Sequence, residues 1–267
     1  MNLQTLLDLA ATRKPGRISA VGASAFERAV LAEWERRGWQ VHHCEGDMPD
    51  CLYHAVDRAV KGETDMIFCA GDEGLKLTRL LDNAMPREFK PLSVMQGFEV
   101  PTYQKMLWAG FTPMGNYDSI PEAIKGVQTM VRTLTNLGEP AAKVALLSCV
   151  ELISASVHST IWEATIGHMS QRGQFGAAKV DGPLAFDLAV SPRAVDEKGL
   201  KSEIGGQADL VIPPDLNSFE TLVDAIHLSG EHRAVGILVG GPCPIALPPH
   251  RSERHLDLSL KIASLLI

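Results

Sequence analysis

The sequence has 267 residues but no long apolar run, no excess of basic residues and no paired cysteine motif. A membrane-spanning helix needs about 20 consecutive apolar residues, and the apolar runs here are short and strand-like, such as residues 235–239. The formal net charge of −7 argues against a broad surface for nucleic acid or anionic lipid, although a small pocket for an anion remains compatible with it. Residues 1–17 carry Asp8 and have no basic start, so we expect no signal peptide.

The cysteines are few, odd in number and scattered, and none forms a CxxC pair. This pattern favours buried thiols in a reducing cytoplasm and predicts no zinc site. Cys243 lies in a Gly-Pro loop and is the one candidate for a reactive thiol, but a packed small side chain is the more ordinary interpretation. The five residues are Cys44, Cys51, Cys69, Cys149 and Cys243.

Apolar residues make up 45% and charged residues 21% of the chain, which excludes disorder and a collagen-like repeat. Strand-like and helical patterns alternate along almost the whole chain, which predicts an α/β fold with a parallel sheet and helices on both faces. The predicted strands are 17–21, 39–43, 65–70, 92–96, 143–148, 179–181, 209–212 and 234–240, with a hairpin-like stretch at 98–115. The predicted helices are 24–37, 52–61, 74–83, 119–137, 160–172, 218–228 and 255–267.

Ligands of such sheets bind beyond the carboxyl ends of the strands. We therefore expect the site in the loops 71–72, 181–183, 213–215 and 240–251. In the second of these loops Asp181 and Asp187 flank a Gly-Pro turn, where Asp181 as a helix N-cap and Asp187 as a solvated helix residue are the ordinary alternatives to a ligand contact.

A predicted helix starts close to Ser159 and Thr160. These residues either cap the helix or bring its free N–H groups to a phosphate.

The second half of the chain carries the most specific motifs. They read VALLSCVE (144–151), RGQFGAAKVDGPLAFDLAVS (172–191), KGLKSEIGGQADLVIPPDL (198–216) and AVGILVGGPCPIAL (234–247). The sequence in these motifs resembles the phosphate acetyltransferase and phosphate butyryltransferase family, and is closer to the butyryl branch. The likeness is dense from about residue 143 onward and fainter before it, where TDMIFCAG (64–71), Arg79 and FEVP (98–101) match in place.

The resemblance implies an α/β fold of two domains, an isocitrate/isopropylmalate dehydrogenase-like α/β/α sandwich with the cleft between the domains. By matched positions, the first domain is discontinuous, 1–91 plus 236–267, and the second is 92–235. It also implies a cytoplasmic homodimer, and the apolar tail 256–267 is compatible with an interface. The alternative for this tail is a helix buried within its own subunit.

The resemblance further implies a reaction in which acyl-coenzyme A and inorganic phosphate give an acyl phosphate and free coenzyme A. Coenzyme A is then a substrate, and no permanent cofactor or metal is expected. The partners are small molecules rather than nucleic acid or membrane. The reaction needs a base or a positive neighbour for a thiol of pKa about 8.5 and arginines or helix N–H groups for phosphate.

The resemblance implies three catalytic residues: His250, Arg251 and Asp257. His250 stands at the position of the family's serine, next to Arg251. Asp257 follows the arginine by six residues and is implied to be the base for the thiol. The alternative role of Asp257 is to stabilise the first turns of its helix. Arg79 and Arg251 are expected to line one cleft and hold phosphate. The remaining predicted contacts to phosphate or substrate are Ser159, Thr160, Asp181, Gly182, Asp187, Gly240 and Gly241.

Two other functions compete with the transferase. Asp72 and Glu73 stand where the family has a short polar loop, and Gly110–Phe111 replaces its Thr-Asp pair. These acids and the histidine at the serine position favour a non-catalytic or altered-specificity protein that binds coenzyme A or phosphate on the same fold. A metal- and NAD-dependent dehydrogenase would instead need acids gathered around one metal, for which Asp181, Asp187 and Asp215 are the candidates.

Overall fold

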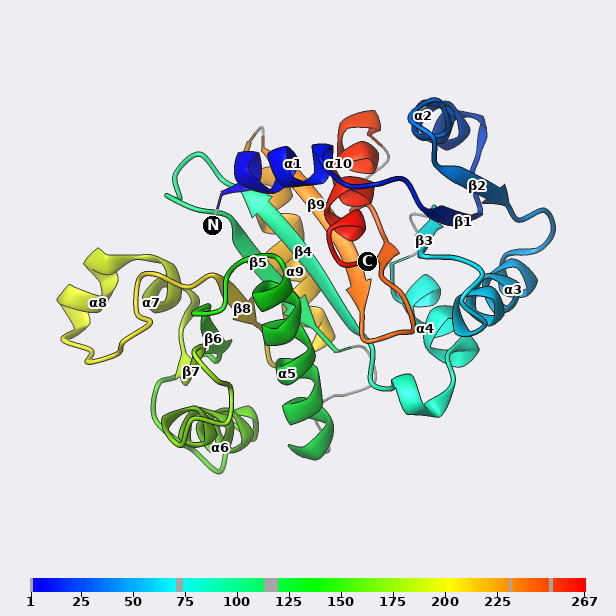
Figure 1. Cartoon of the computed structure of the whole chain (residues 1–267). Helices are drawn as coiled ribbons and strands as arrows, with labels where there is room; N and C mark the ends of the chain where they lie inside the picture. The colour runs from blue at the N-terminus through cyan, green and yellow to red at the C-terminus, as the bar shows by residue number, and fades with distance from the viewer. Residues whose placement is uncertain (1, 71–73, 113–119, 231, 250–251) are drawn as a thin grey trace. The chain divides into compact units, whose positions relative to one another are not determined.

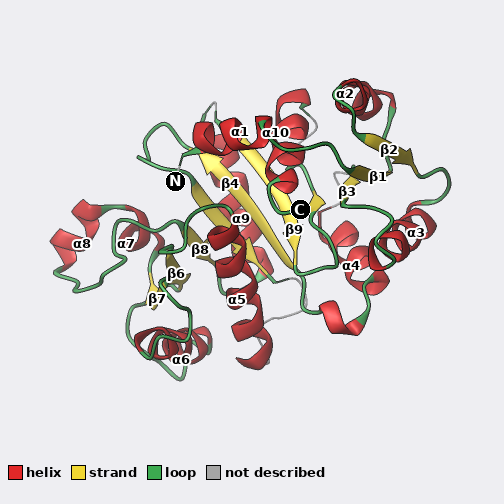
Figure 2. Ribbon diagram, viewed as in Figure 1, coloured by secondary structure: helices red, strands yellow, loops and turns green. Residues whose placement is uncertain are grey.

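The computed structural model describes residues 2–70, 74–112, 120–230, 232–249 and 252–267. The chain forms two compact units. One is the continuous segment Gly97–His232, and the other combines Asn2–Gln96 with Arg233–Ile267. Strands alternate with helices in both units (Figure 2), which confirms the predicted α/β class. Strand β4 (Ser93–Glu99) carries the chain from one unit into the other.

The discontinuous unit holds strands in the order β2-β1-β3-β10-β9. Neighbouring strands are parallel from β2 to β10, but β10 is antiparallel to β9. The expectation of a parallel sheet fails at the pair β9–β10, because only residues 240–244 separate the two strands and so short a connection can only turn back. The strands are β1 (Arg17–Val21), β2 (Gln40–His43), β3 (Met66–Cys69), β9 (Arg233–Val239) and β10 (Ile245–Ala246).

Helices cover both faces of these strands (Figure 1). Helix α10 packs on β9 and contacts α1 and α2, whereas α3 packs on β1 and contacts α4. The helices are α1 (Leu3–Ala11), α2 (Ala25–Arg36), α3 (Met48–Val60), α4 (Gly74–Ala84) and α10 (Glu253–Ser264), with a short 3₁₀ turn at Arg87–Phe89. Helix α3 begins four residues before its predicted start, at a position where Pro49 in the first turn supplies a helical φ angle.

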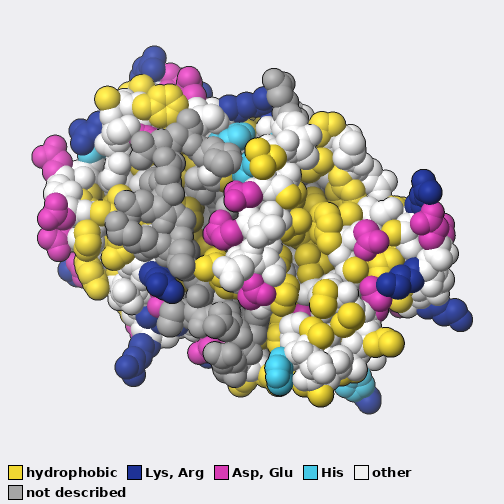
Figure 3. Space-filling model, turned by 180° about the vertical axis from the view of Figure 1, so that it is seen from behind, with side chains coloured by type: hydrophobic (Ala, Val, Ile, Leu, Met, Phe, Trp, Pro, Cys, Tyr) yellow, Lys and Arg dark blue, Asp and Glu magenta, His cyan; other side chains and the backbone are white. Residues whose placement is uncertain are grey.

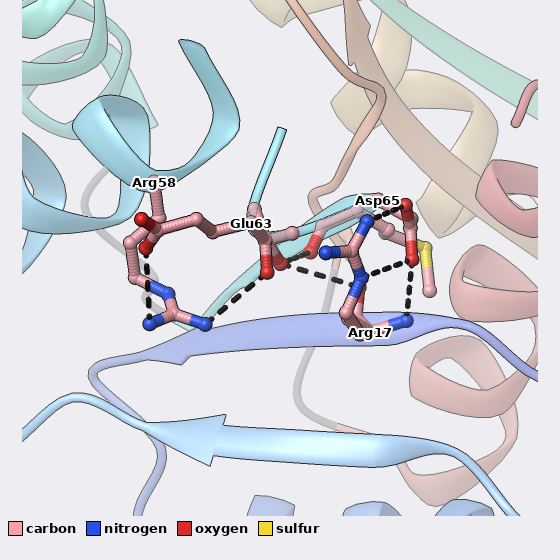
Figure 4. Close-up of polar contacts among 6 residues, drawn as sticks. Arg17, Arg58, Glu63 and Asp65 are labelled. Carbon is pink, nitrogen blue, oxygen red and sulfur yellow. Dashed lines mark hydrogen bonds and ion pairs between the residues drawn. The ribbon is translucent and has the colours of Figure 1, made fainter. Parts of the chain in front are cut away.

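Charged side chains fix the register where the parallel strands begin. Arg17, at the start of β1, donates from its backbone N–H and its guanidinium to Asp65, which precedes β3 (Figure 4). The Nη2–Oδ1 distance is 2.7 Å, and this pairing lowers the pKa of Asp65.

Gly236 lies inside β9, beside Leu247, the residue that follows β10. Its carbonyl accepts from Leu247 N–H at 2.9 Å, and its N–H donates to the Ser259 hydroxyl on α10 at 3.0 Å. A Cβ atom at this position would overlap the carbonyl oxygen of Leu247. Glycine therefore allows β9 to approach both neighbours closely.

The continuous unit orders its strands β5-β8-β6-β7, all parallel. Helix α6 packs on β7 and contacts α5, while α9 packs on β5; Figure 1 draws α5 in front of these strands and α9 behind them. The strands are β5 (Leu107–Phe111), β6 (Lys143–Leu147), β7 (Lys179–Leu184) and β8 (Leu210–Ile212). The helices are α5 (Ile120–Asn136), α6 (Ser159–Gln171), α7 (Phe186–Val190), α8 (Pro192–Lys198) and α9 (Leu216–Leu228).

Asp209 joins the starts of three of these strands. It is 6% exposed, accepts from the backbone N–H of Lys143 at 2.8 Å, and lies 2.6 Å from the ammonium of Lys105. The buried carboxylate is thus paired and hydrogen-bonded, as burial of a charge requires.

Strand β7 corrects the prediction of a turn at residues 181–183. The strand continues through this segment to Leu184, and a Cβ atom at Gly182 would lie 2.7 Å from Leu146 of β6. Glycine therefore allows close contact between two strands here, and Asp181 lies within a strand rather than at a helix cap.

Within the part of the chain that the structure describes, no helix is both long enough and apolar enough to cross a membrane. On the face drawn in Figure 3, acidic and basic side chains are interspersed rather than gathered by sign. This distribution agrees with the absence of a broad basic surface that the net charge of −7 predicts.

Candidate active site

A cavity of about 1170 Å³ opens in the continuous unit where strands β6 and β8 end and helices α6 and α9 begin. This is the carboxyl edge of neighbouring parallel strands, and Pro213, Pro214 and Asp215 of a predicted site loop line it. Its polar wall includes Ser148, Cys149, His158, Ser159, Asp215 and Ser218.

Large apolar side chains form the remaining wall and are partly exposed. Ile120, Ile161 and Phe186 are 37%, 43% and 37% exposed, and all three line the cavity. Apolar surface left in water favours a ligand that covers it, at about 25 cal/mol per Å² buried. The cavity therefore suits a molecule that has both an apolar stem and polar or anionic groups.

The start of α6 is open towards the cavity. His158 occupies the N-cap position without a side-chain hydrogen bond to the helix, and both His158 and Ser159 line the cavity. A helix start without a side-chain cap presents the positive end of the helix dipole. In this turn the N–H groups of Thr160 and Ile161 already donate to the carbonyls of Val157 and His158, at 3.0 and 3.2 Å. This corner can bind an oxyanion or a phosphate.

The start of α9, which lines the same cavity, is closed. Asp215 accepts the backbone N–H of Ser218 at 2.9 Å and the Ser218 hydroxyl at 3.0 Å. The helix thus supplies its own carboxylate as a cap. Between α6 and α9, α6 is therefore the helix whose start is better suited to an anion.

Glu163 lies one turn after Ser159, on the buried side of α6. It is 0% exposed, and neither carboxylate oxygen has a hydrogen-bond partner among the described residues. Burial raises its pKa to about 8, and the nearby Ser159 hydroxyl, which does not reach hydrogen-bond geometry, opposes that shift only in part. The group is therefore mainly a neutral acid at pH 7. The sequence analysis did not single out Glu163. Its spacing of three residues from both Thr160 and Ile166, which are buried, is the signal that could have placed it on the buried face of the helix.

Thr160, a predicted phosphate contact, is directed into the loop before α6. Its hydroxyl accepts from the backbone N–H of Ser154 at 2.9 Å and donates to the carbonyl of Val157 at 2.7 Å. These bonds favour the structural alternative, in which Thr160 fixes the entry to the helix. Ser159 is the predicted contact that does line the cavity.

The other predicted contacts of this unit lie outside the cavity wall. Asp181 accepts from the Ser202 hydroxyl at 2.8 Å and from the backbone N–H of Gly182 at 3.0 Å. Asp187 is exposed on α7 and accepts from the backbone N–H of Leu188 at 2.9 Å. Asp187 thus matches the solvated helix residue considered from the sequence.

The predicted residues of the discontinuous unit have separate surroundings. Arg79 is exposed on α4. Gly240 follows β9 with a φ of +100°, and a Cβ atom on Gly241 would lie 3.3 Å from Met85. His250 and Arg251, like Asp72 and Glu73, lie outside the described residues.

Asp257 is held by the helices around it. Its Oδ1 accepts from Trp34 Nε1 at 3.1 Å and lies 4.0 Å from Arg37 Nη1. Its Oδ2 lies 2.6 Å from Lys261 Nζ, one turn further along α10. The side chain is 26% exposed. These contacts suit the structural role for Asp257, and its role as a base stays a prediction.

The acids proposed for a dehydrogenase metal do not gather. Among the residues that the structure describes, the single group of metal-ligand type is His42, Cys44 and His54, and it contains none of Asp181, Asp187 or Asp215. Burial raises the pKa of Cys243 to about 12, as expected for a packed thiol rather than a nucleophile.

A model of the family described as phosphate acetyl/butaryl transferase matches residues 23–248. The chain belongs to this family. The resemblance inferred from the motifs in the second half is thereby confirmed.

Two family members illustrate the likeness. Phosphate butyryltransferase of Clostridium acetobutylicum is 29% identical over 217 residues, covering 79% of this chain and 70% of that protein. Phosphate acetyltransferase of Thermotoga maritima is 27% identical over 220 residues, covering 82% and 74%.

Solved structures share the fold of this family member. A branched-chain phosphotransacylase from Enterococcus faecalis aligns with a TM-score of 0.76 at 22% identity, over 94% of this chain and 98% of the other. A phosphotransacetylase from Streptococcus pyogenes aligns with a TM-score of 0.77 at 15% identity, over 99% and 98%.

Proposed function

We propose that the chain transfers an acyl group between coenzyme A and inorganic phosphate, and that the cavity beside α6 binds the acyl-coenzyme A. The observation that carries the proposal is the combination, in one cavity of a phosphate acetyl/butaryl transferase family member, of an uncapped helix start with partly exposed apolar walls. Acyl-coenzyme A has the matching chemistry, since it joins phosphate groups to a thioester through a long, flexible arm.

In this reaction a phosphate oxygen attacks the thioester carbonyl carbon, and an oxyanion forms at the carbonyl oxygen. The C–S bond then breaks and the acyl phosphate forms. The proton that the attacking phosphate gives up passes to the departing thiolate by way of Asp257, and in the reverse direction the Asp257 carboxylate removes it from the coenzyme A thiol. Donors aimed at the oxyanion and at phosphate lower the barrier. The positive end of the α6 dipole, left without a side-chain cap, is suited to an anionic group of the substrate, while Ile120, Ile161 and Phe186 are suited to its apolar arm.

The family likeness supplies the remaining roles of the proposal. Arg79 and Arg251 hold phosphate, His250 takes the position of the family's serine, and Asp257 acts on the thiol. The same proposal includes an isocitrate dehydrogenase-like fold, a cytoplasmic homodimer, and coenzyme A as a substrate without a permanent cofactor.

A second candidate is a protein that binds coenzyme A without turnover. Two observations favour it: the Asp215 carboxylate stands in the cavity, and Asp257 is engaged by Trp34 and Lys261. An acid in the cavity repels phosphate, and an ion-paired acid is a weaker base.

The test measures loss of the thioester absorbance of straight and branched short-chain acyl-coenzymes A, with and without phosphate. Thioester absorbance is preferable to a thiol reagent because the chain has its own five cysteines. Phosphate-dependent loss for at least one acyl chain supports the transferase. Tight binding of coenzyme A, measured by calorimetry, without any turnover supports the binding protein. If the chain shows no turnover and no binding of coenzyme A, both candidate functions are overturned.

A further inference from the structure

We propose that His42, Cys44 and His54 form a binding site for a divalent metal ion of the zinc class, with the fourth coordination position open to water. The site lies in the discontinuous unit, where β2 leads into α3. It is independent of the acyl transfer proposed above, which uses no metal.

Two of the three ligands come from the end of one strand. His42 belongs to β2, and Cys44 extends the same ladder, because its backbone N–H donates to the carbonyl of Ala20 in β1 at 2.9 Å. Side chains two residues apart along a strand point to the same side. The imidazole and the thiol therefore face one direction.

The third ligand comes from the helix that follows. Figure 1 shows the chain leaving β2 and turning back into α3, which carries His54 in its second turn. The rings of His42 and His54 have centroids 5.6 Å apart. One ligand atom from each of the three residues lies within 4.8 Å of the others.

That spacing is close to what a metal ion requires. Tetrahedral zinc, with Zn–N of about 2.0–2.1 Å and Zn–S of about 2.3 Å, separates its ligand atoms by about 3.3–3.6 Å. Small side-chain rotations cover the difference, and they are open here because His42 and His54 are exposed. Imidazole with thiolate selects zinc-class ions over magnesium or calcium, which prefer oxygen ligands.

Charges around the cluster act in both directions. The connecting segment 45–53 carries Glu45, Asp47 and Asp50, all exposed, which attract a cation. The positive charge of Arg58, on α3, repels a cation, and Glu63 partly offsets that charge. Arg58 Nη1 lies 3.6 Å from the Glu63 carboxylate, and its Nη2 donates to the Glu63 carbonyl at 3.2 Å (Figure 4).

Protons compete with the metal at the same atoms. Partial burial of the ring, with a contribution from Arg58, lowers the pKa of His42, which favours the neutral ring that binds a metal. Burial raises the pKa of Cys44, so metal binding releases the thiol proton.

The experiment titrates Co²⁺ into the full-length, reduced, chelator-treated protein and then displaces it with Zn²⁺. A thiolate ligand gives Co²⁺ an intense near-ultraviolet charge-transfer band. We expect one Co²⁺ per chain with this band, its displacement by Zn²⁺, and a higher melting temperature with Zn²⁺.

Variants assign the band to its ligands. Cys44→Ser should abolish it, and His54→Asn should weaken Co²⁺ binding by at least about tenfold, since even outer-shell partners of a metal contribute 10–100-fold. Cys149→Ser and His168→Asn, exposed residues of the other unit, are the matched controls and should bind like the parent.

Circular dichroism of the metal-free variants shows whether each is folded. We expect the histidine variants to fold, because His42 and His54 are exposed. Absence of the band in the parent protein overturns the proposal. So does a band that persists in Cys44→Ser or disappears equally in Cys149→Ser.

Discussion

Helices α6 and α10 each carry an acidic residue at their fifth position, and the two acids have opposite surroundings. Glu163 of α6 is fully buried, and both of its oxygens lack partners among the described residues. Asp257 of α10 is partly exposed and bound by Trp34 and Lys261. The family motif singled out Asp257, whereas burial singled out Glu163. A family motif indicates the role that relatives give to a position. The burial and partners of a side chain decide whether it holds a proton near neutral pH.

The largest effect is expected from Asp257→Asn. If Asp257 is the base for the coenzyme A thiol, turnover should fall by about 10²–10⁴-fold with little change in coenzyme A affinity. With acyl phosphate and coenzyme A as substrates, where the thiol must lose its proton, the acidic limb of the pH–rate profile should disappear as well. Steady-state kinetics with calorimetry on the same preparation measures both quantities.

Asp57→Asn is the matched control, because Asp57 forms an ion pair with Lys61 at 2.6 Å in the same i,i+4 spacing on α3. If Asp257 acts only structurally, both variants should keep their rate and lose at most about 1–2 kcal/mol of unfolding free energy. An unchanged rate in Asp257→Asn would remove that residue from the chemistry.

The next effect concerns Glu163 and pH. Its pKa is raised from an ordinary 4.5 to about 8 in the folded chain, so the folded state binds its proton more tightly than the unfolded state. The stability linked to this group is fully present below pH 4.5 and is lost as the pH rises through 8. We expect a loss of about 2–4 kcal/mol in urea unfolding across this window.

Glu163→Gln should flatten this dependence, because the amide does not titrate. Glu122→Gln, at an exposed position of α5, should retain the parent's slope. If the unfolding free energy depends on pH with the same slope in the parent, Glu163→Gln and Glu122→Gln, then Glu163 is ionised and has a partner in solution. The two acids would then have similar surroundings.

A smaller effect is expected at the open start of α6. Ser159→Asp places a carboxylate where the proposal has an anion, and phosphate affinity should fall by about 1–2 kcal/mol, roughly 5–30-fold. Protein stability should rise slightly, by about 0.3–1 kcal/mol, since acids favour helix starts. Ser156→Asp adds the same charge to an exposed residue outside the cavity wall and should leave phosphate affinity nearly unchanged.

Local patterns predicted the elements well where apolar spacing and caps agree. Strand β1 begins and ends as predicted, and Ser24 caps α2 with the reciprocal Glu27 contact of a capping box. The errors fall where tertiary contact overrides a local signal. Gly182 suggested a turn, but β7 continues through it against β6, and β10 is too short for any periodicity to predict.

The candidate site was predictable only in part, for the same reason. Pro213–Asp215, predicted from the strand-end rule, and Ser159, predicted from the helix start, all line the cavity, and their roles there stay predictions. The metal-ligand cluster was missed, because His54 stands ten residues after Cys44 and no CxxC spacing brings them together. The contact between His42 of β2 and His54 of α3 brings the ligands together, and it exists only in the folded chain.

The close approach at Gly236 has a consequence for sequence variation. If every residue were exchanged in turn and the library screened for folded protein, position 236 should tolerate no replacement, because even alanine meets the Leu247 carbonyl oxygen. Gly62 and Gly138 offer the contrast: their φ angles are positive, at +68° and +98°, but a Cβ atom at either position would meet no described atom within 4 Å. Asparagine, which accepts such angles, should survive at both. Gly236 is thus fixed by crowding, whereas Gly62 and Gly138 are favoured by backbone geometry alone and can be replaced.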